Sequence, residues 1–176
     1  MSARINRTMG AKSLNKYEKL SSILKYIFVD VCKIDQDKYF ILGSFAIREH
    51  RLINDLDINI DTSEFMKLER AVERGFGGIE FYNGQIRWYF DLTDEYNTLN
   101  GAAENDFSIE AFMKDSRAGF PNSKFSLGHL IKTHSLDVDR NGHPFFNLAT
   151  LLKWKKTMNR PKDSADIELI KALLKS

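Results

Sequence analysis

The segment 55–60 (DLDINI) constrains the fold most strongly, because polar and apolar residues alternate in it without a break. Successive side chains of a β-strand point to opposite faces, so strict alternation indicates a strand with one buried face. The three aliphatic residues would enter a core, and Asp55, Asp57 and Asn59 would lie on the other face. The chain is therefore expected to contain a sheet that buries one face and presents carboxylates on the other.

The composition provides a core for such a sheet. Apolar residues make up 43% of the 176 residues and aromatic residues 12%, which excludes a wholly disordered chain. This length favours one domain, or one domain with a small appendage. Lys and Arg number 26 against 24 Asp and Glu, and a net charge of +2 does not by itself imply nucleic-acid binding.

The sequence has the features of a soluble protein from a reducing, cytoplasmic compartment. Its one cysteine, Cys32, cannot form an internal disulfide, which excludes a disulfide-stapled secreted fold. Cys32 lies in an apolar helical pattern and is expected to be a buried thiol. Residues 1–7 lack the apolar region of a signal peptide, and no apolar run approaches the ~20 residues of a membrane span. We therefore expect no membrane association.

Apolar spacing and turn residues divide the chain into helices and strands. The clearest further element is a hairpin, because Asn83-Gly84 separates two strand patterns. The predicted elements are helix 13–33, strand 39–42, one or two helical turns within 45–53, strand 55–60, helix 64–74, hairpin strands 79–82 and 86–92, a short helix at 109–114, a second hairpin within 125–146 turning at Asn141-Gly142, and helices 148–158 and 163–175.

This order predicts an α+β fold, with a small mixed sheet, flanking helices and a C-terminal helical pair. Residues 1–12 are expected to be a mobile basic tail. Residues 13–147 would form the core, with a variable insertion at about 94–147 that begins with a long polar stretch. Residues 148–176 would form two helices that pack on this core.

The predicted strand 39–42 ends at Gly43-Ser44, and this turn has the chemistry of a phosphate site. Glycine lets the backbone approach a ligand closely, and the first backbone N–H groups of a following helix favour anions. The Ser44 hydroxyl adds a further donor. The turn therefore predicts a phosphate cradle, with an ordinary strand-to-helix turn as the structural alternative.

Two carboxylates follow this turn on the alternating strand. Asp55 and Asp57 lie two residues apart, so they share a face at a spacing of roughly 6–7 Å. Such oxygen ligands suit Mg²⁺, and two of these ions can hold the attacking and the leaving oxygen at a phosphorus atom. Asp91 is the best third ligand, because it shares a strand face with Arg87 and Tyr89 in an otherwise aromatic run. The structural alternatives are a solvated strand face and a polar strand end.

The order of these motifs resembles the nucleotidyltransferase superfamily, which has a DNA polymerase beta-like fold. Its pattern is Gly-Ser, ten residues, Asp-x-Asp and a later strand carboxylate, matched here by Gly43-Ser44, Asp55, Asp57 and Asp91. The segment 43–48 (GSFAIR) is similar to the Gly-Ser-x-Ala-x-Arg form of the minimal members.

The C-terminal segment resembles the same family. Lys153 is similar to the helical lysine of small members, and residues 160–166 (RPKDSAD) are similar to their Arg-x-Lys-Asp-x-x-Asp run. The resemblance covers residues 39–92 closely and 148–174 loosely. Residues 94–147 match none of the family's motifs, and acceptor recognition is expected there.

The resemblance implies a Mg²⁺-dependent enzyme that transfers a nucleoside monophosphate from an NTP to a hydroxyl and releases pyrophosphate. Asp55, Asp57 and Asp91 would be catalytic and would hold two Mg²⁺ ions. Asp91 would bind the ion nearest the acceptor and help to deprotonate the attacking hydroxyl. Gly43 and Ser44 would hold the β- and γ-phosphates.

Two cations are further nucleotide-binding candidates. Arg48 would contact phosphate or form a surface salt bridge, and Lys153 would reach the triphosphate or extend its ammonium group from an apolar helix face. The acceptor is left open among a small molecule, an RNA end and a protein side chain. Nothing in the sequence selects an oligomeric state.

Two other functions share this fold expectation. One is a non-catalytic binding module, such as an antitoxin-like partner, and the other is a small nucleic-acid polymerase. The weak net charge disfavours the polymerase. Convergence of Asp55, Asp57 and Asp91 on one site would favour catalysis over the binding module.

Three further groups of residues have structural interpretations. Residues 137–142 (DVDRNG) match the opening of an EF-hand loop, but position 12 would be Leu148, so a hairpin turn is favoured. The four histidines lack zinc spacing and are interpreted as surface or loop residues; they are His50, His129, His134 and His143. The last group is interpreted as a helix-capping and ion-pair cluster of Arg160, Lys162, Asp163 and Asp166.

Overall fold

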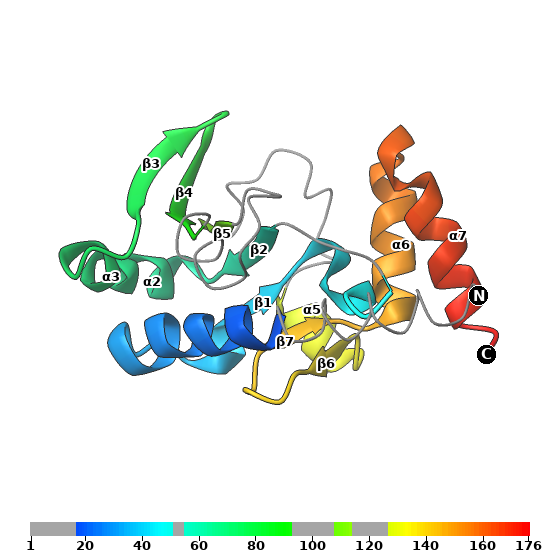
Figure 1. Cartoon of the computed structure of the whole chain (residues 1–176), viewed down its shortest axis with the longest axis horizontal. Coiled ribbons are helices and arrows are strands. Elements are labelled where there is room, and N and C mark those ends of the chain that lie inside the picture. Colours follow the sequence, from blue (N-terminus) through cyan, green and yellow to red (C-terminus); the bar gives the residue numbers. More distant parts are fainter. Residues whose placement is uncertain (1–16, 51–54, 93–107, 114–126) are drawn as a thin grey trace, which may run out of the picture.

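The computed structural model describes residues 17–50, 55–92, 108–113 and 127–176. Within them, one mixed sheet carries helices on both faces (Figure 1). The strands are β1 Tyr39–Ile41, β2 Asp55–Ile60, β3 Gly78–Tyr82, β4 Gln85–Asp91, β5 Ser108–Met113, β6 Leu136–Val138 and β7 Pro144–Phe146. The predicted α+β class is therefore confirmed. The tail predicted at 1–12 lies outside the described residues.

The seven strands lie in the order β3-β4-β5-β2-β1-β7-β6. The pairs β2–β5 and β1–β7 are parallel, and the other neighbours are antiparallel. The alternating strand β2 thus lies at the centre of the sheet, with β5 on one side and β1 on the other. Its two neighbours decide which side chains surround Asp55 and Asp57.

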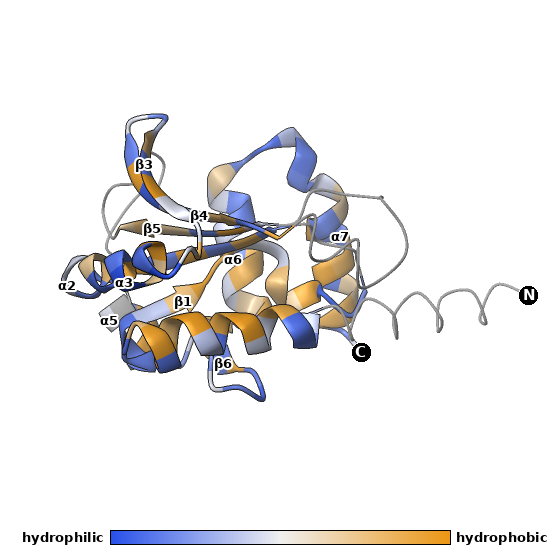
Figure 2. Cartoon of the chain, turned by 60° about the vertical axis from the view of Figure 1, so that its left-hand side comes forward, coloured by the Kyte–Doolittle hydropathy of each residue, from blue (hydrophilic) through white to orange (hydrophobic). Residues whose placement is uncertain are grey.

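One face of the sheet is covered by the N-terminal helix, residues 17–31, whose last part, Lys25–Val31, is a π-helix. Helical segments that follow β2 lie on the same face; they are α2 Thr62–Phe65, η4 Met66–Leu68 and α3 Glu69–Glu73. Apolar residues recur along these helices (Figure 2) and pack with Leu56, Ile58 and Ile60 in one buried core. The helices predicted at 13–33 and 64–74 are confirmed where they are described.

The opposite face is covered at β1 and β7 by three helices (Figure 1), which are α5 Leu127–Lys132, α6 Leu148–Met158 and α7 Ser164–Leu173. Their apolar side chains form a second core with Phe40 and Phe146, which includes Leu151, Trp154 and Ile170. The predicted C-terminal helical pair is thus confirmed as α6 and α7. Both helices lie on the sheet face to which Asp55 and Asp57 also belong.

The short helix predicted at 109–114 is wrong, because residues 108–113 form the strand β5. Its residues, SIEAFM, mix helix formers with residues that favour strands, and a run of this length carries no decisive period. Pairing decides the conformation, since β5 lies between β2 and β4 and is hydrogen-bonded to both. A strand therefore separates β2 from the hairpin strand that carries Asp91.

The second predicted hairpin is confirmed only in its later half. β6 and β7 pair antiparallel around the turn at Asn141-Gly142, whereas residues 127–132 form the helix α5. The first hairpin is confirmed, with β3 and β4 joined through Asn83 and Gly84, both at positive φ. No helix in the described ranges is long and apolar enough to cross a bilayer.

Candidate functional site

The turn after β1 and the carboxylate of Asp57 lie next to each other, as the sequence suggested. The Leu42 backbone N–H donates to the Asp57 carbonyl at 2.7 Å, which joins the end of β1 to the start of β2. Gly43 follows at φ +66°, a conformation that favours glycine, and opens the short 3-10 helix Gly43–Ile47. A Cβ atom at Gly43 would lie 3.8 Å from Asp57 Oδ2. The backbone turn therefore lies within contact distance of this carboxylate.

The alternation of β2 is confirmed. Leu56, Ile58 and Ile60 are buried, while Asp55 is exposed and Asp57 is half-buried on the other face. Asn59 continues the polar face but is itself buried, because Phe40 and Phe112 flank it on the neighbouring strands. The open part of this face is thus confined to the first half of β2, beside the Gly43 turn.

A third carboxylate that the sequence did not indicate lies on β5. Glu110 is directly opposite Asp57 in the parallel register of β2 and β5, so the two side chains share a face one strand apart. Burial raises the pKa of Glu110, and the negative charges of Asp57 and Asp55 raise it further, against the opposing effect of Arg87. Glu110 was missed because its segment was predicted to be a helix.

Asp91 lies on the same face but one strand farther away. It pairs with Ser108 on β5, and Ser108 in turn pairs with Asp55. Two strand spacings, roughly 10 Å of backbone separation, therefore lie between Asp91 and β2. The predicted common face of Arg87, Tyr89 and Asp91 is confirmed by this register, but Glu110 is the carboxylate nearer to Asp57.

Arg87 connects Glu110 to the β3–β4 hairpin. Its Nη1 lies 2.9 Å from Glu110 Oε2, and its Nε and Nη2 lie 2.8 and 2.6 Å from Glu80 Oε1. The guanidinium also lies over the rings of Tyr82 and Tyr89. The acidic face therefore contains a well-held cation that was not predicted to belong to the site.

Ser44 is tied to the C-terminal helices. Its Oγ donates to Asp166 Oδ2 at 3.1 Å, and the same Asp166 oxygen accepts from Lys155 Nζ at 2.8 Å. Lys155 Nζ also lies 2.8 Å from Asp163 Oδ1, and Arg160 donates to Asp163 as well. The predicted ion-pair cluster is confirmed for Arg160, Asp163 and Asp166, whereas its buried lysine is Lys155 and not the exposed Lys162. The predicted capping role is wrong, because Asp163 makes no side-chain cap bond in α7.

The lysine in this network is Lys155 and not Lys153. The side chain of Lys155 is 2% exposed, whereas Lys153 is exposed on the outer side of α6. Lys155 follows the buried Leu151 by four residues, so the helical period already assigns it to the inner stripe. The predicted nucleotide contact of Lys153 is therefore not brought to the Gly43 turn.

Arg48 packs against the core on the opposite face of the sheet. Its guanidinium lies 4.5 Å from the ring centre of Phe45 and 4.9 Å from that of Phe145, and Nη1 donates to the Phe45 carbonyl. Both rings belong to the core that contains Ile58. Burial lowers the pKa of Arg48. The structure thus does not bring Arg48 together with Asp57.

The residues 137–142 and the histidines have structural roles. Asp139 accepts from the backbone N–H groups of Asn141 and His143, so residues 137–142 form a hairpin turn as predicted. His50, His129 and His134 are exposed, as the surface interpretation predicted, whereas His143 lies in the loop between β6 and β7 but is fully buried there. It contacts Tyr39 and the N-terminal helix, which the local sequence could not indicate.

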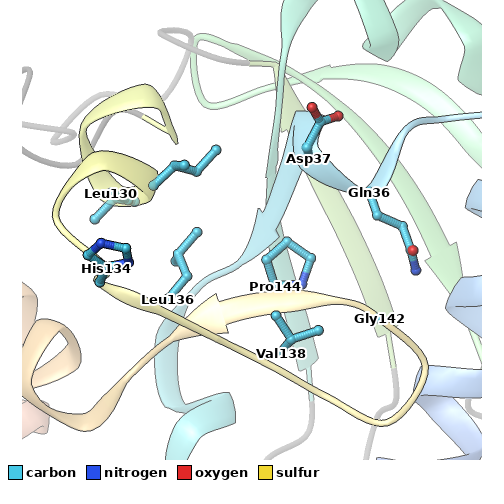
Figure 3. Close-up of a pocket in the computed structure, with 9 residues that line it drawn as sticks. Gln36, Asp37, Leu130, His134, Leu136, Val138, Gly142 and Pro144 are labelled. Carbon is cyan, nitrogen blue, oxygen red and sulfur yellow. The ribbon is translucent and has the colours of Figure 1, made fainter.

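A separate hollow of about 380 Å³ lies between α5 and the β6–β7 hairpin (Figure 3). Its walls are mainly aliphatic, with Leu130, Leu136, Val138 and Pro144 among them. Asp37 at its rim precedes β1, whereas Gly43 follows β1. The hollow therefore lies at the other end of this strand from the carboxylates.

The donor chemistry of the acidic face fits Mg²⁺ through Asp55 and Asp57. Across the described part of the chain, no three His, Cys, Asp or Glu side chains converge closely enough to hold one ion. Mg²⁺ in nucleotide sites is commonly held by one or two carboxylates together with substrate phosphates and water. A pair of strand carboxylates beside a turn that admits close approach meets that requirement.

Comparison with known proteins identifies no relative of this chain. No protein-family model matches the chain, and no curated protein or solved structure is significantly similar to it. The functional conclusion therefore depends on the chemistry of the residues themselves.

Proposed function

We propose that the protein is a Mg²⁺-dependent nucleotidyltransferase, which moves a nucleoside monophosphate from an NTP to a hydroxyl acceptor and releases pyrophosphate. The observation that carries the proposal is the position of Asp57, which shares a face with Asp55 and Glu110 and lies within contact distance of the Gly43 turn. Carboxylates and a glycine turn at one sheet edge suit a metal-bound triphosphate.

Each residue has a distinct role in this proposal. Asp55 and Asp57 bind the metal that carries the triphosphate, and Mg²⁺ supplies charge neutralisation at the reacting phosphate. The backbone at Gly43 and Ser44 lies against the phosphates. Catalysis of this kind depends mainly on positioning and electrostatic stabilisation, so few further groups are required.

In this proposal Glu110 takes the role that was predicted for Asp91. It lies directly opposite Asp57 on the same face of the sheet, and a carboxylate placed beside the reacting hydroxyl can accept its proton. When the acceptor oxygen attacks the α-phosphorus, the hydroxyl proton passes to Glu110. The bond from the α-phosphorus to its bridging oxygen breaks, and pyrophosphate leaves.

Asp166 positions the turn. Because it accepts from both Ser44 and Lys155, it fixes the Gly43–Ile47 helix to α6 and α7. A phosphate site depends on a backbone that is already in its binding conformation. The C-terminal helices therefore hold the phosphate-binding turn in place in this proposal.

A non-catalytic binding module is the second candidate. The observation that favours it is the projecting β3–β4 hairpin, where Ile79, Phe81 and Ile86 are 38%, 76% and 37% exposed. Exposed apolar residues that cluster in this way are typical of protein contact surfaces. This candidate requires no turnover and no metal dependence.

The test of the proposed function is transfer of label from each of the four α-labelled NTPs in Mg²⁺, with hydroxyl-bearing acceptors from the three classes. We expect labelled product from wild type and none from Asp57→Asn. Asp37→Asn, the same change at the far end of β1, should retain full transfer. Absence of transfer in wild type, or equal transfer by Asp57→Asn, would reject the catalytic function.

A further inference from the structure

Arg87 has two carboxylate partners of different exposure. Glu80 lies on the hairpin with its side chain 49% exposed, whereas Glu110 lies at the sheet centre at 17%. The Arg87 side chain itself is only 11% exposed. A guanidinium this enclosed needs partners for its N–H groups, and its five donors allow it to serve both carboxylates at once.

The contacts between Arg87 and Glu80 are separate from the contact between Arg87 and Glu110. Two of its nitrogens, Nε and Nη2, contact the same Glu80 oxygen. The rings of Tyr82 and Tyr89 lie 3.8 and 4.8 Å from its central carbon, which adds cation–π attraction along the strand face. Arg87 can therefore keep its position when Glu110 turns away.

Arg87 contacts Glu110 through its Nη1, which lies 2.9 Å from Glu110 Oε2. Arg87 attracts it from the hairpin side, and Asp57 stands directly opposite it on β2. Any divalent ion held by Asp57 would attract Glu110 in the other direction. The same carboxylate thus lies between the cation that the protein supplies and the cation that the proposed reaction needs.

We propose that Arg87 is the internal counter-ion of the site, which holds Glu110 in the metal-free protein and releases it to a divalent ion bound at Asp55 and Asp57. This inference rests on the proposed function, because it takes Asp57 as a metal ligand. It accounts for the absence, within the described residues, of a converged three-carboxylate cluster: Glu110 is engaged by Arg87. Arg87 is a positioning residue, and it acts on the ion only through Glu110.

The test is binding of Mn²⁺ alone, measured by the loss of the free-ion electron paramagnetic resonance signal. Arg87→Met removes the competing charge and leaves Glu110 available, so we expect Mn²⁺ to bind about tenfold more tightly than to wild type. Arg140→Met is the matched control, since it removes the same charge from an exposed arginine paired with Glu18. Its Mn²⁺ affinity should equal that of wild type.

Asp57→Asn separates this inference from the proposed function. Wild type that binds no Mn²⁺, or Asp57→Asn that binds it unchanged, would reject the metal site itself. Binding that is lost in Asp57→Asn but unchanged or weakened in Arg87→Met would reject the counter-ion role alone. If Arg87→Met does not fold, Arg87→Lys replaces it. Lysine lacks the two-armed contact with Glu80, so we then expect a gain in Mn²⁺ affinity of about threefold. An unchanged Mn²⁺ affinity in Arg87→Lys would contradict the counter-ion role.

Discussion

Asp57 and Glu110 lie directly opposite each other on the parallel strands β2 and β5. Burial raises the pKa of Glu110, and the repulsion between two carboxylates in this register raises it further. Arg87 offsets part of that repulsion from the other side of Glu110. The acidic face is therefore an arrangement that a bound cation stabilises, and its two principal members come from strands that are far apart in the sequence.

The buried ion-pair network should be sensitive to loss of its lysine. Lys155→Ala leaves the carboxylates of Asp163 and Asp166 buried without the ammonium group that contacts both, and breaking a buried pair of this kind costs about 3–5 kcal/mol. Lys153→Ala, an exposed position on the same helix, should change the free energy of unfolding by less than about 0.5 kcal/mol. Urea denaturation of both variants measures the difference, and equal stability would contradict the assigned network.

A side chain at Gly43, in the turn beside Asp57, should destabilise the protein because of the backbone conformation there. Gly43 has φ +66°, and a Cβ atom there would meet Asp57 Oδ2 only at ordinary contact distance. Gly43→Ala should therefore lower the free energy of unfolding by about 1–2 kcal/mol, the cost of a left-handed residue. A Cβ atom added at Gly78 would have no neighbour within 4 Å, and Gly78 has no positive φ. Gly78→Ala should therefore change the free energy of unfolding very little. A neutral Gly43→Ala in chemical denaturation would indicate that the turn is not held in this conformation.

Stability should fall on mild acidification because of His143. Its Nε2 donates to the Ser21 carbonyl at 2.9 Å, so its Nδ1 accepts from the Tyr39 hydroxyl and the buried ring is neutral. Burial lowers the pKa of His143 below its usual 6.5. The unfolded chain therefore binds the proton first. The stabilisation that the neutral His143 contributes is complete above about pH 6.5. As the pH falls through the folded-state pKa, the free energy of unfolding decreases by at most about 1.4 kcal/mol per pH unit.

Denaturation of wild type, His143→Gln and His129→Gln between pH 7.5 and 5 measures this effect. The decline that belongs to His143 should be absent from His143→Gln and present in His129→Gln, whose ring is exposed. If His143→Gln shows the same pH dependence as wild type, another group is responsible.

The parts of the fold with strong local signals could be predicted from the sequence. The alternation of residues 55–60 predicted the two faces of β2, although Asn59 on the polar face is buried by its neighbours, and Asn83-Gly84 identified the β3–β4 turn. The bounds of α6, Leu148–Met158, follow from its apolar period. The contact between the Gly43 turn and Asp57 was also expected, because a strand that ends in glycine is followed closely by the strand that carries the aspartates.

The parts that failed depend on pairing between distant segments. β5 is a six-residue run of mixed propensity whose strand conformation is determined by its pairing with β2 and β4. Because β5 was not predicted as a strand, Glu110 was not considered as a site residue, and Asp91 stays an untested prediction. Lys155 was accessible to local reasoning, since it shares the inner stripe of α6 with Leu151. Its partners Asp163 and Asp166 became evident only from the packing of α7.

The most direct test of the central claim compares Glu110→Gln with Asp91→Asn in Mg²⁺-dependent pyrophosphate release from NTP. Both substitutions replace a carboxylate by its amide on the same sheet face, but only Glu110 lies opposite Asp57. We predict that Glu110→Gln reduces turnover by at least about 100-fold, as removal of a catalytic acid–base group does, while Asp91→Asn retains turnover within about twofold of wild type. Loss of turnover in Asp91→Asn with full turnover in Glu110→Gln would contradict the account and return the third position to Asp91.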